Sequence, residues 1–101
     1  MKKKNKQNLQ RRNDLIFKVE KTINGQNAHY IQRLLFFYSF CFSVQSYETV
    51  SSVKKSFYLK MIPIYEDALS KINYNTTILE LKEINKKCDI DYLASEKKSK
   101  I

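Results

Sequence analysis

The longest hydrophobic stretch of the chain lies in its middle, at residues 30–47, YIQRLLFFYSFCFSVQSY. At about 100° per residue, its polar residues fall on one narrow stripe and its apolar residues cover most of the remaining circumference. A helix that is apolar nearly all round is typical of the inside of a bundle. We therefore predict a central helix over Tyr30–Tyr47, with the other helices packed around it. The polar stripe consists of Gln32, Ser39, Ser43 and Ser46.

Part of this stretch, residues 38–44, also alternates between large hydrophobic and smaller residues, as a buried strand would. The stretch nevertheless runs for eighteen residues without a glycine, a proline or a turn cluster, which is long for a strand and ordinary for a helix. The whole chain has one glycine and one proline, whereas sandwiches and barrels need frequent turn residues. We therefore favour an all-α fold.

Hydrophobic residues at helical spacing also precede the central stretch. They predict a helix from Leu9 to about Ile23, ended by Asn24-Gly25, because glycine reaches the left-handed conformation that closes many helices. The same dipeptide is typical of β-hairpins, but the helical periodicity before it argues against a hairpin. Asn27 is expected to cap the central helix, its side-chain oxygen accepting from free backbone amides.

Helical spacing resumes after the central stretch and continues from Val50 to Ile72. Pro63 interrupts this segment, because proline lacks the amide that would bond back to Leu59. Either the helix is kinked there, or a second helix begins at Pro63. The sequence leaves both possibilities open.

A last helix is predicted by a capping-box signature, in which Thr77 is followed three residues later by Glu80. We expect this helix to end near Lys87, with one further turn from Asp89 to Ala94. The predicted fold is thus a small bundle of four helices, or five if Pro63 separates two.

Charge divides the chain into a nearly neutral body and two basic ends. The net charge is +9, of which residues 1–12 carry +6 and residues 96–101 carry +2. We expect a single helical domain at 9–94 between disordered basic ends at 1–8 and 95–101. Such arms hold polyanions, such as nucleic acid or an anionic membrane. Lysine-rich ends also keep a small protein soluble, and AT-rich coding alone raises lysine content.

Basic residues mixed with aromatic ones form the best candidate binding surface. Between residues 54 and 60, three lysines and two aromatic rings fall in under two helical turns. They could neutralise phosphates and stack an unpaired base, although any solvated amphipathic helix carries similar residues. Arg33 lies one turn before Phe37 and offers a second such pair. The candidate nucleic-acid-binding residues are Lys2, Lys3, Lys4, Lys6, Arg11, Arg12, Arg33, Lys54, Lys55, Tyr58, Lys60, Lys97 and Lys98.

Catalytic and metal-binding patterns are lacking in the sequence. The single histidine, His29, has no cysteine or carboxylate cluster near it, and there is no glycine-rich phosphate loop. Three pairs of acids lie beside lysines or at helix ends, without a second catalytic group. We expect no enzyme, no cofactor, no metal and no small-molecule substrate. The acid pairs are Glu66/Asp67, Glu80/Glu83 and Asp89/Asp91.

The expected location is inside the cell, in a reducing compartment. Cys41 and Cys88 are the only cysteines and make no disulfide scaffold. No hydrophobic run follows the N-terminal lysines, so we expect no signal peptide. The longest nearly unbroken hydrophobic run, Leu34–Val44, is shorter than the roughly 20 residues that cross a bilayer.

Two functions from different classes fit these features. The leading interpretation is a non-enzymatic protein that binds RNA, together with neighbouring proteins, in a ribonucleoprotein assembly such as a ribosome. The alternative is a small helical interaction protein, of the inhibitor or immunity type, acting on a protein partner or at an anionic membrane surface. Tyrosines and phenylalanines would suit such a protein interface, and polybasic ends would suit anionic lipids.

Overall fold

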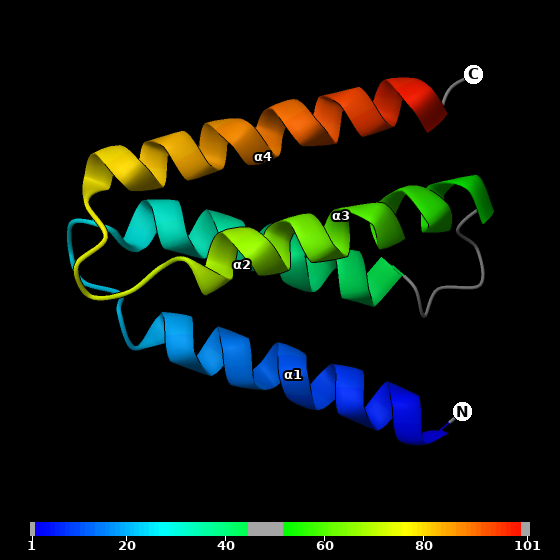
Figure 1. Cartoon of the computed structure of the whole chain (residues 1–101), viewed down its shortest axis with the longest axis horizontal. Coiled ribbons are helices and arrows are strands. Elements are labelled where there is room, and N and C mark those ends of the chain that lie inside the picture. Colours follow the sequence, from blue (N-terminus) through cyan, green and yellow to red (C-terminus); the bar gives the residue numbers. More distant parts are fainter. Residues whose placement is uncertain (1, 45–51, 100–101) are drawn as a thin grey trace.

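A computed structural model describes the backbone of residues 2–44 and 52–99, and the side chains of residues 10–44 and 54–96. The described part contains four helices and no strand, which confirms the predicted all-α bundle. The strand alternative for residues 38–44 is therefore wrong. The helices are α1 (Lys2–Glu20), α2 (Ala28–Val44), α3 (Ser52–Ser70) and α4 (Ile78–Ser99) (Figure 1).

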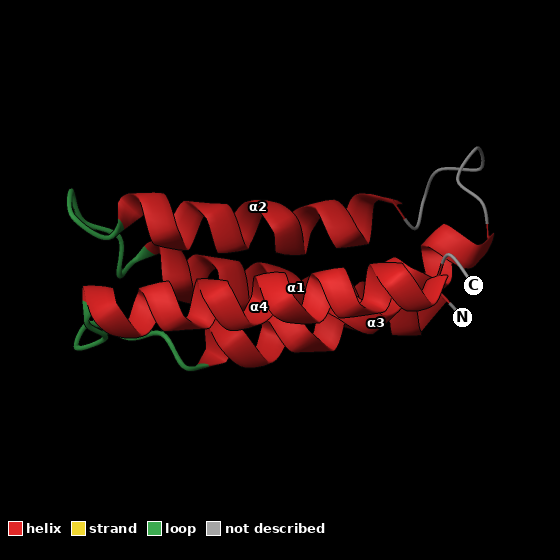
Figure 2. Ribbon diagram, turned by 90° about the horizontal axis from the view of Figure 1, so that it is seen from above, coloured by secondary structure: helices red, strands yellow, loops and turns green. Residues whose placement is uncertain are grey.

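Successive helices run in opposite directions and form a flattened bundle of 38 × 33 × 18 Å. α2 and α3 contact each other most extensively, and α1 and α4 flank this pair on opposite sides (Figure 1). Viewed along the bundle's edge, α2 forms one broad face and α3 the other (Figure 2). The core therefore lies along the contact between α2 and α3.

The core is built mainly from large side chains of α2 and α3. Tyr38 of α2 and Tyr65 of α3 are the largest fully buried residues. The ring of Phe37 stacks on that of Tyr65 with centroids 6.1 Å apart. The ring of Tyr92 of α4 also contacts the Phe37 ring, with centroids 6.3 Å apart. α1 contributes Val19, and α4 contributes Leu81. Each flanking helix thus supplies a narrow apolar stripe, while α2 and α3 supply most of the core.

The joint between α1 and α2 depends on two asparagines and differs from the predicted closure. Gly25 has no positive φ, so the predicted left-handed glycine is wrong. Asn24 Oδ1 instead accepts from the amides of Gln26 and Asn27, and Asn27 Oδ1 accepts from the amide of Asn24 at 2.7 Å. Asn27 begins α2 through its backbone carbonyl, which accepts from Ile31. Its side chain closes the loop rather than capping the helix as predicted.

The first and last helices are longer than the sequence pattern predicted. α1 begins at Lys2 rather than Leu9, so residues 2–8 extend the helix instead of forming a separate arm. Lysine and glutamine are good helix formers, and no glycine or proline interrupts them. α4 does not end near Lys87, because Cys88 and Tyr92 continue its buried face, and it extends to Ser99.

Pro63 lies inside α3, which continues unbroken from Ser52 to Ser70. The predicted fifth helix is therefore absent from the described residues. Pro63 is exposed, and so is Leu59, whose carbonyl loses its helical donor. Because both residues lie on the solvent side of the helix, water can satisfy this carbonyl and the proline is tolerated.

The predicted cap of the last helix is confirmed. The Glu80 amide donates to Thr77 Oγ1 at 3.1 Å, and the Leu81 amide donates to the Thr77 carbonyl at 3.0 Å. Glu80 also places a negative charge in the first turn of α4, where the helix dipole favours it.

The central helix is not covered all round as predicted. Its buried side comprises the residues Ile31, Leu34, Leu35, Tyr38, Cys41 and Val44. Its other side is open, with Phe36 66% exposed and Phe40 42% exposed. Phe40 is left partly open because the three other helices all pack on one side of α2. Residues 45–47 of the predicted helix lie outside the described range.

Candidate nucleic-acid interface

The alternating helix directions bring three separate basic segments to one end of the bundle. α1 begins, α3 begins and α4 ends at this end, whereas the short loops 21–27 and 71–77 lie at the other (Figure 1). We call this end the basic pole. Its candidate residues are Lys2, Lys3, Lys4 and Lys6 of α1, Lys54 and Lys55 of α3, and Lys97 and Lys98 of α4. The candidates Arg11, Arg12 and Lys60 lie near the middle of their helices.

Helix dipoles add no net positive potential at the basic pole. The N-termini of α1 and α3 lie here with partial positive charge, but the C-termini of α2 and α4 lie here as well with partial negative charge. The positive character of this end therefore comes from its side chains, and neither α1 nor α3 has an acid in its first turn. The side chains of the four N-terminal lysines, and those of Lys97 and Lys98, lie outside the described range.

The two arginines of α1 differ in how firmly they are held. Arg11 is mostly exposed, and its Nη2 lies 3.9 Å from Glu66 Oε1. Arg12 is half-buried, with its guanidinium 5.3 Å from the centre of the Phe42 ring. Arg11 therefore has the freedom to meet a phosphate, whereas Arg12 also anchors α1 to α2.

The lysines of α3 and the predicted stacking residue Tyr58 have unequal access to solvent. Lys54 and Lys60 are exposed, and Lys55 is half-buried. The Tyr58 ring lies between the rings of Phe40 and Phe57, with centroid distances of 5.5 and 4.9 Å. Tyr58 thus takes part in the packing of α2 against α3, and only part of its surface faces solvent.

Arg33 does not join the other candidates. It lies near the start of α2, towards the end of the bundle opposite the basic pole. Its Nη1 is 3.0 Å from Asp89 Oδ1 and 3.1 Å from Asn85 Oδ1. Its guanidinium also covers the Phe37 ring at 5.0 Å, so the predicted pairing of Arg33 with Phe37 is confirmed. These contacts fix α2 to α4.

The paired acids contact cations or hydroxyl groups of the fold. Glu66 Oε2 accepts a hydrogen bond from the Tyr38 hydroxyl at 2.9 Å. Burial, followed by this hydrogen bond and the negative charge of Glu66, raises the pKa of Tyr38. Asp67 pairs with Lys71 at 3.0 Å. Their positions are consistent with roles in packing and solvation.

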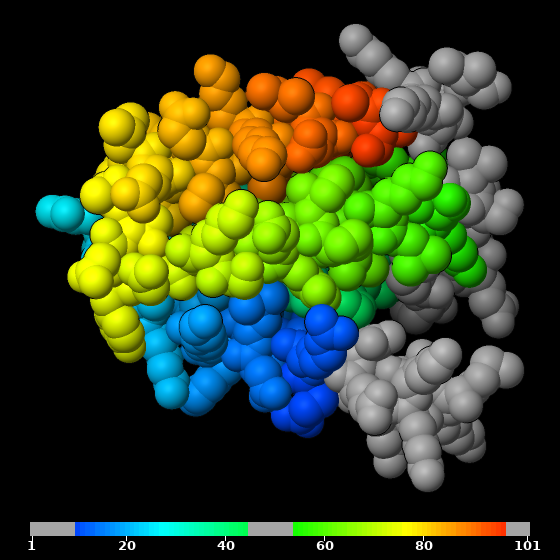
Figure 3. Space-filling model, viewed as in Figure 1, coloured from blue at the N-terminus to red at the C-terminus, as the bar shows by residue number. Residues whose placement is uncertain are grey.

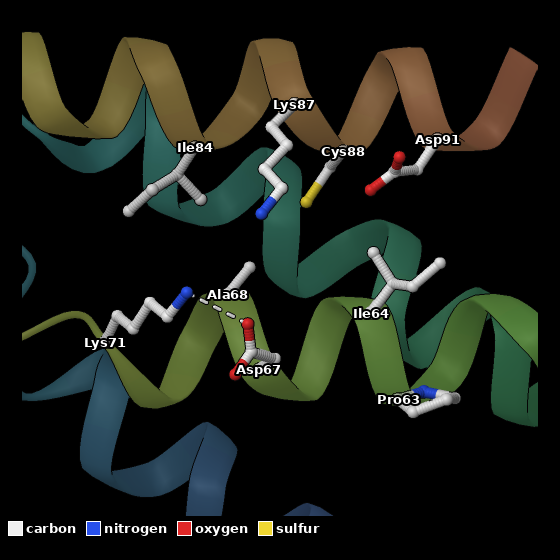
Figure 4. Close-up of a pocket in the computed structure, with 9 residues that line it drawn as sticks. All are labelled: Pro63, Ile64, Asp67, Ala68, Lys71, Ile84, Lys87, Cys88 and Asp91. Carbon is white, nitrogen blue, oxygen red and sulfur yellow. Dashed lines mark ion pairs between the residues drawn. The ribbon is translucent and has the colours of Figure 1, made fainter.

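A groove of about 270 Å³ lies between α3 and α4 on the broad face formed by α3 (Figure 4). Two acids and two lysines line it, and the Asp67–Lys71 ion pair forms part of its wall. In the space-filling view, α3 covers this face and hides most of α2 (Figure 3). Mixed charges make the groove unsuited to a polyanion. Its apolar residues are Pro63, Ile64, Ala68, Ile84 and Cys88.

The sequence pattern did not identify the two buried thiols as neighbours of the aromatic core. Cys41 and Cys88 are both buried thiols. Burial, followed by the electrostatic influence of Cys88 and Cys41, raises the pKa of Tyr65. Burial raises the pKa of each thiol from 9.0 to about 11. Burial, with a hydrogen bond to Tyr58, also raises the pKa of Tyr92 to about 12.

These shifts predict a loss of stability at alkaline pH. A thiol whose pKa is higher in the folded state loses its proton more readily in the unfolded state. The free energy of unfolding should therefore be unaffected below pH 9 by Cys41 and Cys88, and should fall between about pH 9 and pH 11. The ¹³Cβ chemical shifts of labelled cysteine measure the titration of the two thiols apart from that of the seven tyrosines. Folded protein that titrates near pH 9, as the urea-unfolded chain does, would contradict the buried placement.

Two searches for other kinds of site gave negative results within the described ranges. No group of three or more histidine, cysteine, aspartate or glutamate side chains there lies close enough to hold a metal ion. None of the helices in this part of the chain has the length and apolar character needed to cross a membrane.

Comparisons with protein families, with curated proteins and with solved structures give no match for this chain.

Proposed function

We propose that this chain is a non-enzymatic RNA-binding protein, acting in a ribonucleoprotein assembly such as a ribosome, and that the basic pole is its RNA contact. The observation that supports this proposal is the convergence of three basic segments, distant in sequence, at one end of the bundle. A lysine-rich chain made basic only for solubility has no need of such convergence.

The chemistry at the basic pole suits a phosphate backbone. Exposed Lys54 and Lys60 of α3 and the exposed Arg11 of α1 offer positive charge over a surface that extends from the basic pole to the middle of the bundle. Each phosphate that such a cation neutralises releases counterions, so affinity depends steeply on salt. Since Tyr58 is largely packed, phosphate contacts rather than base stacking supply the binding, and little sequence preference is expected.

Charge removal at two places on the bundle tests this proposal. Lys54→Gln with Lys60→Gln removes two exposed charges from the half of α3 that begins at the basic pole. Lys18→Gln with Lys87→Gln removes two exposed charges elsewhere, from the last turn of α1 and the middle of α4. For a single-stranded RNA oligonucleotide, only the first pair should weaken binding, because only those lysines lie near the phosphates. It should also make the slope of log K against log salt shallower by up to about 1.4, or roughly 0.7 per contact.

Fluorescence anisotropy over a range of salt concentrations provides the measurement, and circular dichroism confirms that both variants fold. Equal losses from the two pairs would mean that net charge alone attracts the RNA. Such a result would remove the basic pole as a specific interface and with it the main support for the proposed function.

A further inference from the structure

We propose that the open face of α2 is the contact surface of a homodimer, in which two copies of this chain pack their α2 helices together about a two-fold axis parallel to α2. This inference does not rest on RNA binding, because it concerns the broad face of the bundle and not the basic pole.

The first argument is the position of two exposed aromatic rings. At about 100° per residue, Phe36 lies opposite the centre of the buried side of α2, on the same stripe as Gln32 and Ser43. Phe40 lies one turn further on, and the two rings stack with centroids 6.4 Å apart. The open side of α2 thus carries two large exposed rings on an otherwise polar stripe. Exposed aromatic rings that gather in one patch indicate an interaction surface, which a second copy of the chain would cover.

The second argument is the shape and size of this face. Its outline of 38 × 33 Å exceeds the roughly 800 Å² that each partner buries in a standard interface. The α2 helix runs along its middle, with a shallow groove on each side. Apolar residues continue across it, since the half-buried Ile16 and Ile23 line one groove and the exposed Ile90 and Leu93 line the other.

The third argument is charge complementarity between the two grooves, which favours a second copy over an unrelated partner. The groove between α1 and α2 has one charged residue, Glu20. The groove between α2 and α4 has Lys82 and Lys86 in addition to the Arg33–Asp89 ion pair. The acid-bearing groove of one copy therefore matches the lysine-bearing groove of another.

The two-fold axis follows from this match. Rotation about an axis parallel to α2 exchanges the α1 side and the α4 side, so each acidic groove faces a basic groove. Glu20 near the end of α1 and Lys82 near the start of α4 both lie at the end of the bundle opposite the basic pole. They are therefore at matching heights. Phe36 and Phe40 of the two copies meet at the centre, where interface energy concentrates.

The mass of the RNA-free full-length chain tests the proposal. Sedimentation equilibrium of nuclease-treated protein, at about 1 to 100 μM, should show twice the 12.1 kDa mass of one chain. Phe36→Ser should weaken the dimer at least about tenfold, because each dimer loses two central rings. The control is Leu59→Ser on the opposite face, where the side chain is 54% exposed. It should leave the dimer unchanged.

Charge reversal tests the orientation. Glu20→Lys alone and Lys82→Glu alone should each weaken the dimer about three- to tenfold, because each places like charges in facing grooves. An equimolar mixture of the two variants should recover the wild-type affinity, since both contacts in the mixed dimer are then of opposite charge. A matched mixture of Lys18→Glu with Glu83→Lys should show no such recovery.

A chain that remains at 12.1 kDa throughout this concentration range would overturn the proposal. The proposal would also be overturned if Phe36→Ser left the dimer intact, or if Leu59→Ser weakened the dimer as much as Phe36→Ser does. Failure of the mixed charge variants to recover would overturn the parallel two-fold arrangement. None of these outcomes involves RNA, so they stand apart from any failure of the proposed function.

Discussion

Leu34→Ala is expected to lower the free energy of unfolding by about 3 to 5 kcal/mol, whereas Phe40→Ala should lower it by only about 1 kcal/mol. Leu34 is fully buried against α3, so its removal leaves a cavity that neighbouring side chains fill only in part. Phe40 is 42% exposed and already shares part of its surface with water. The smaller side chain should therefore cost more to remove than the larger one.

Urea denaturation followed by circular dichroism measures both losses. The protein concentration must be low enough for the monomer to dominate. In a dimer, Phe40→Ala would also weaken the contact between the two chains and so lower the apparent free energy of unfolding further. The urea dependence of the unfolding free energy should stay constant across the variants, as expected when only stability changes. Equal losses from Leu34→Ala and Phe40→Ala would show that Phe40 is covered within a single chain.

The fold was predictable from sequence as far as periodicity and turn chemistry determine it. The helical class and the cap at Thr77 depend on local interactions, and the structure confirms them. The break between the first two helices was also evident, but its hydrogen bonds differ from those predicted for Gly25 and Asn27. The helix ends were less predictable. Nothing in residues 2–8 stops a helix, and the buried spacing through Cys88 and Tyr92 carries α4 past Lys87.

The exposed side of α2 illustrates what a hydrophobic pattern cannot specify. Phe36 shares its stripe with Gln32 and Ser43, and that stripe was the only sign that this side faces away from the core. Periodicity shows which positions are apolar, but the number of neighbouring helices decides which of them are covered. When three neighbouring helices all pack on one side of a helix, the apolar residues on its other side stay exposed. Only the three-dimensional structure shows which residues these are.

The candidate interface combines predictable residues with an arrangement that the sequence does not specify. The sequence shows the basic residues directly, and it also shows the nearly neutral segment that lies between the two basic ends. Their convergence depends on the alternating directions of four helices, which place the first and last helices with their basic ends together. Arg33 shows the converse, since it lies beside an aromatic ring as predicted but is held by Asp89 in a structural contact.

Deletion of residues 1–8 should produce the largest loss of RNA affinity, because it removes four lysines from the basic pole. The slope of log K against log salt should become shallower by up to four phosphate contacts, at roughly 0.7 to 0.9 per contact. The melting temperature should stay the same, since among the described side chains of α1 the core contacts begin at Leu15. Replacing the four lysines by glutamine in the full-length chain is the matched control. It should reproduce the change in slope while preserving the length of α1.

Adding Lys54→Glu and Lys55→Glu to the deletion separates the contribution of α3 from that of α1. If both helices contact one RNA, the combined variant should bind more weakly than either change alone, because the two sets of lysines face the same polyanion. Vesicles with anionic headgroups, tested with the same proteins, distinguish RNA from lipid. RNA affinity that survives the deletion would remove α1 from the interface. Vesicle binding that requires residues 1–8, combined with RNA binding that does not, would favour a membrane surface, since lipid headgroups and RNA phosphates recruit the same lysines.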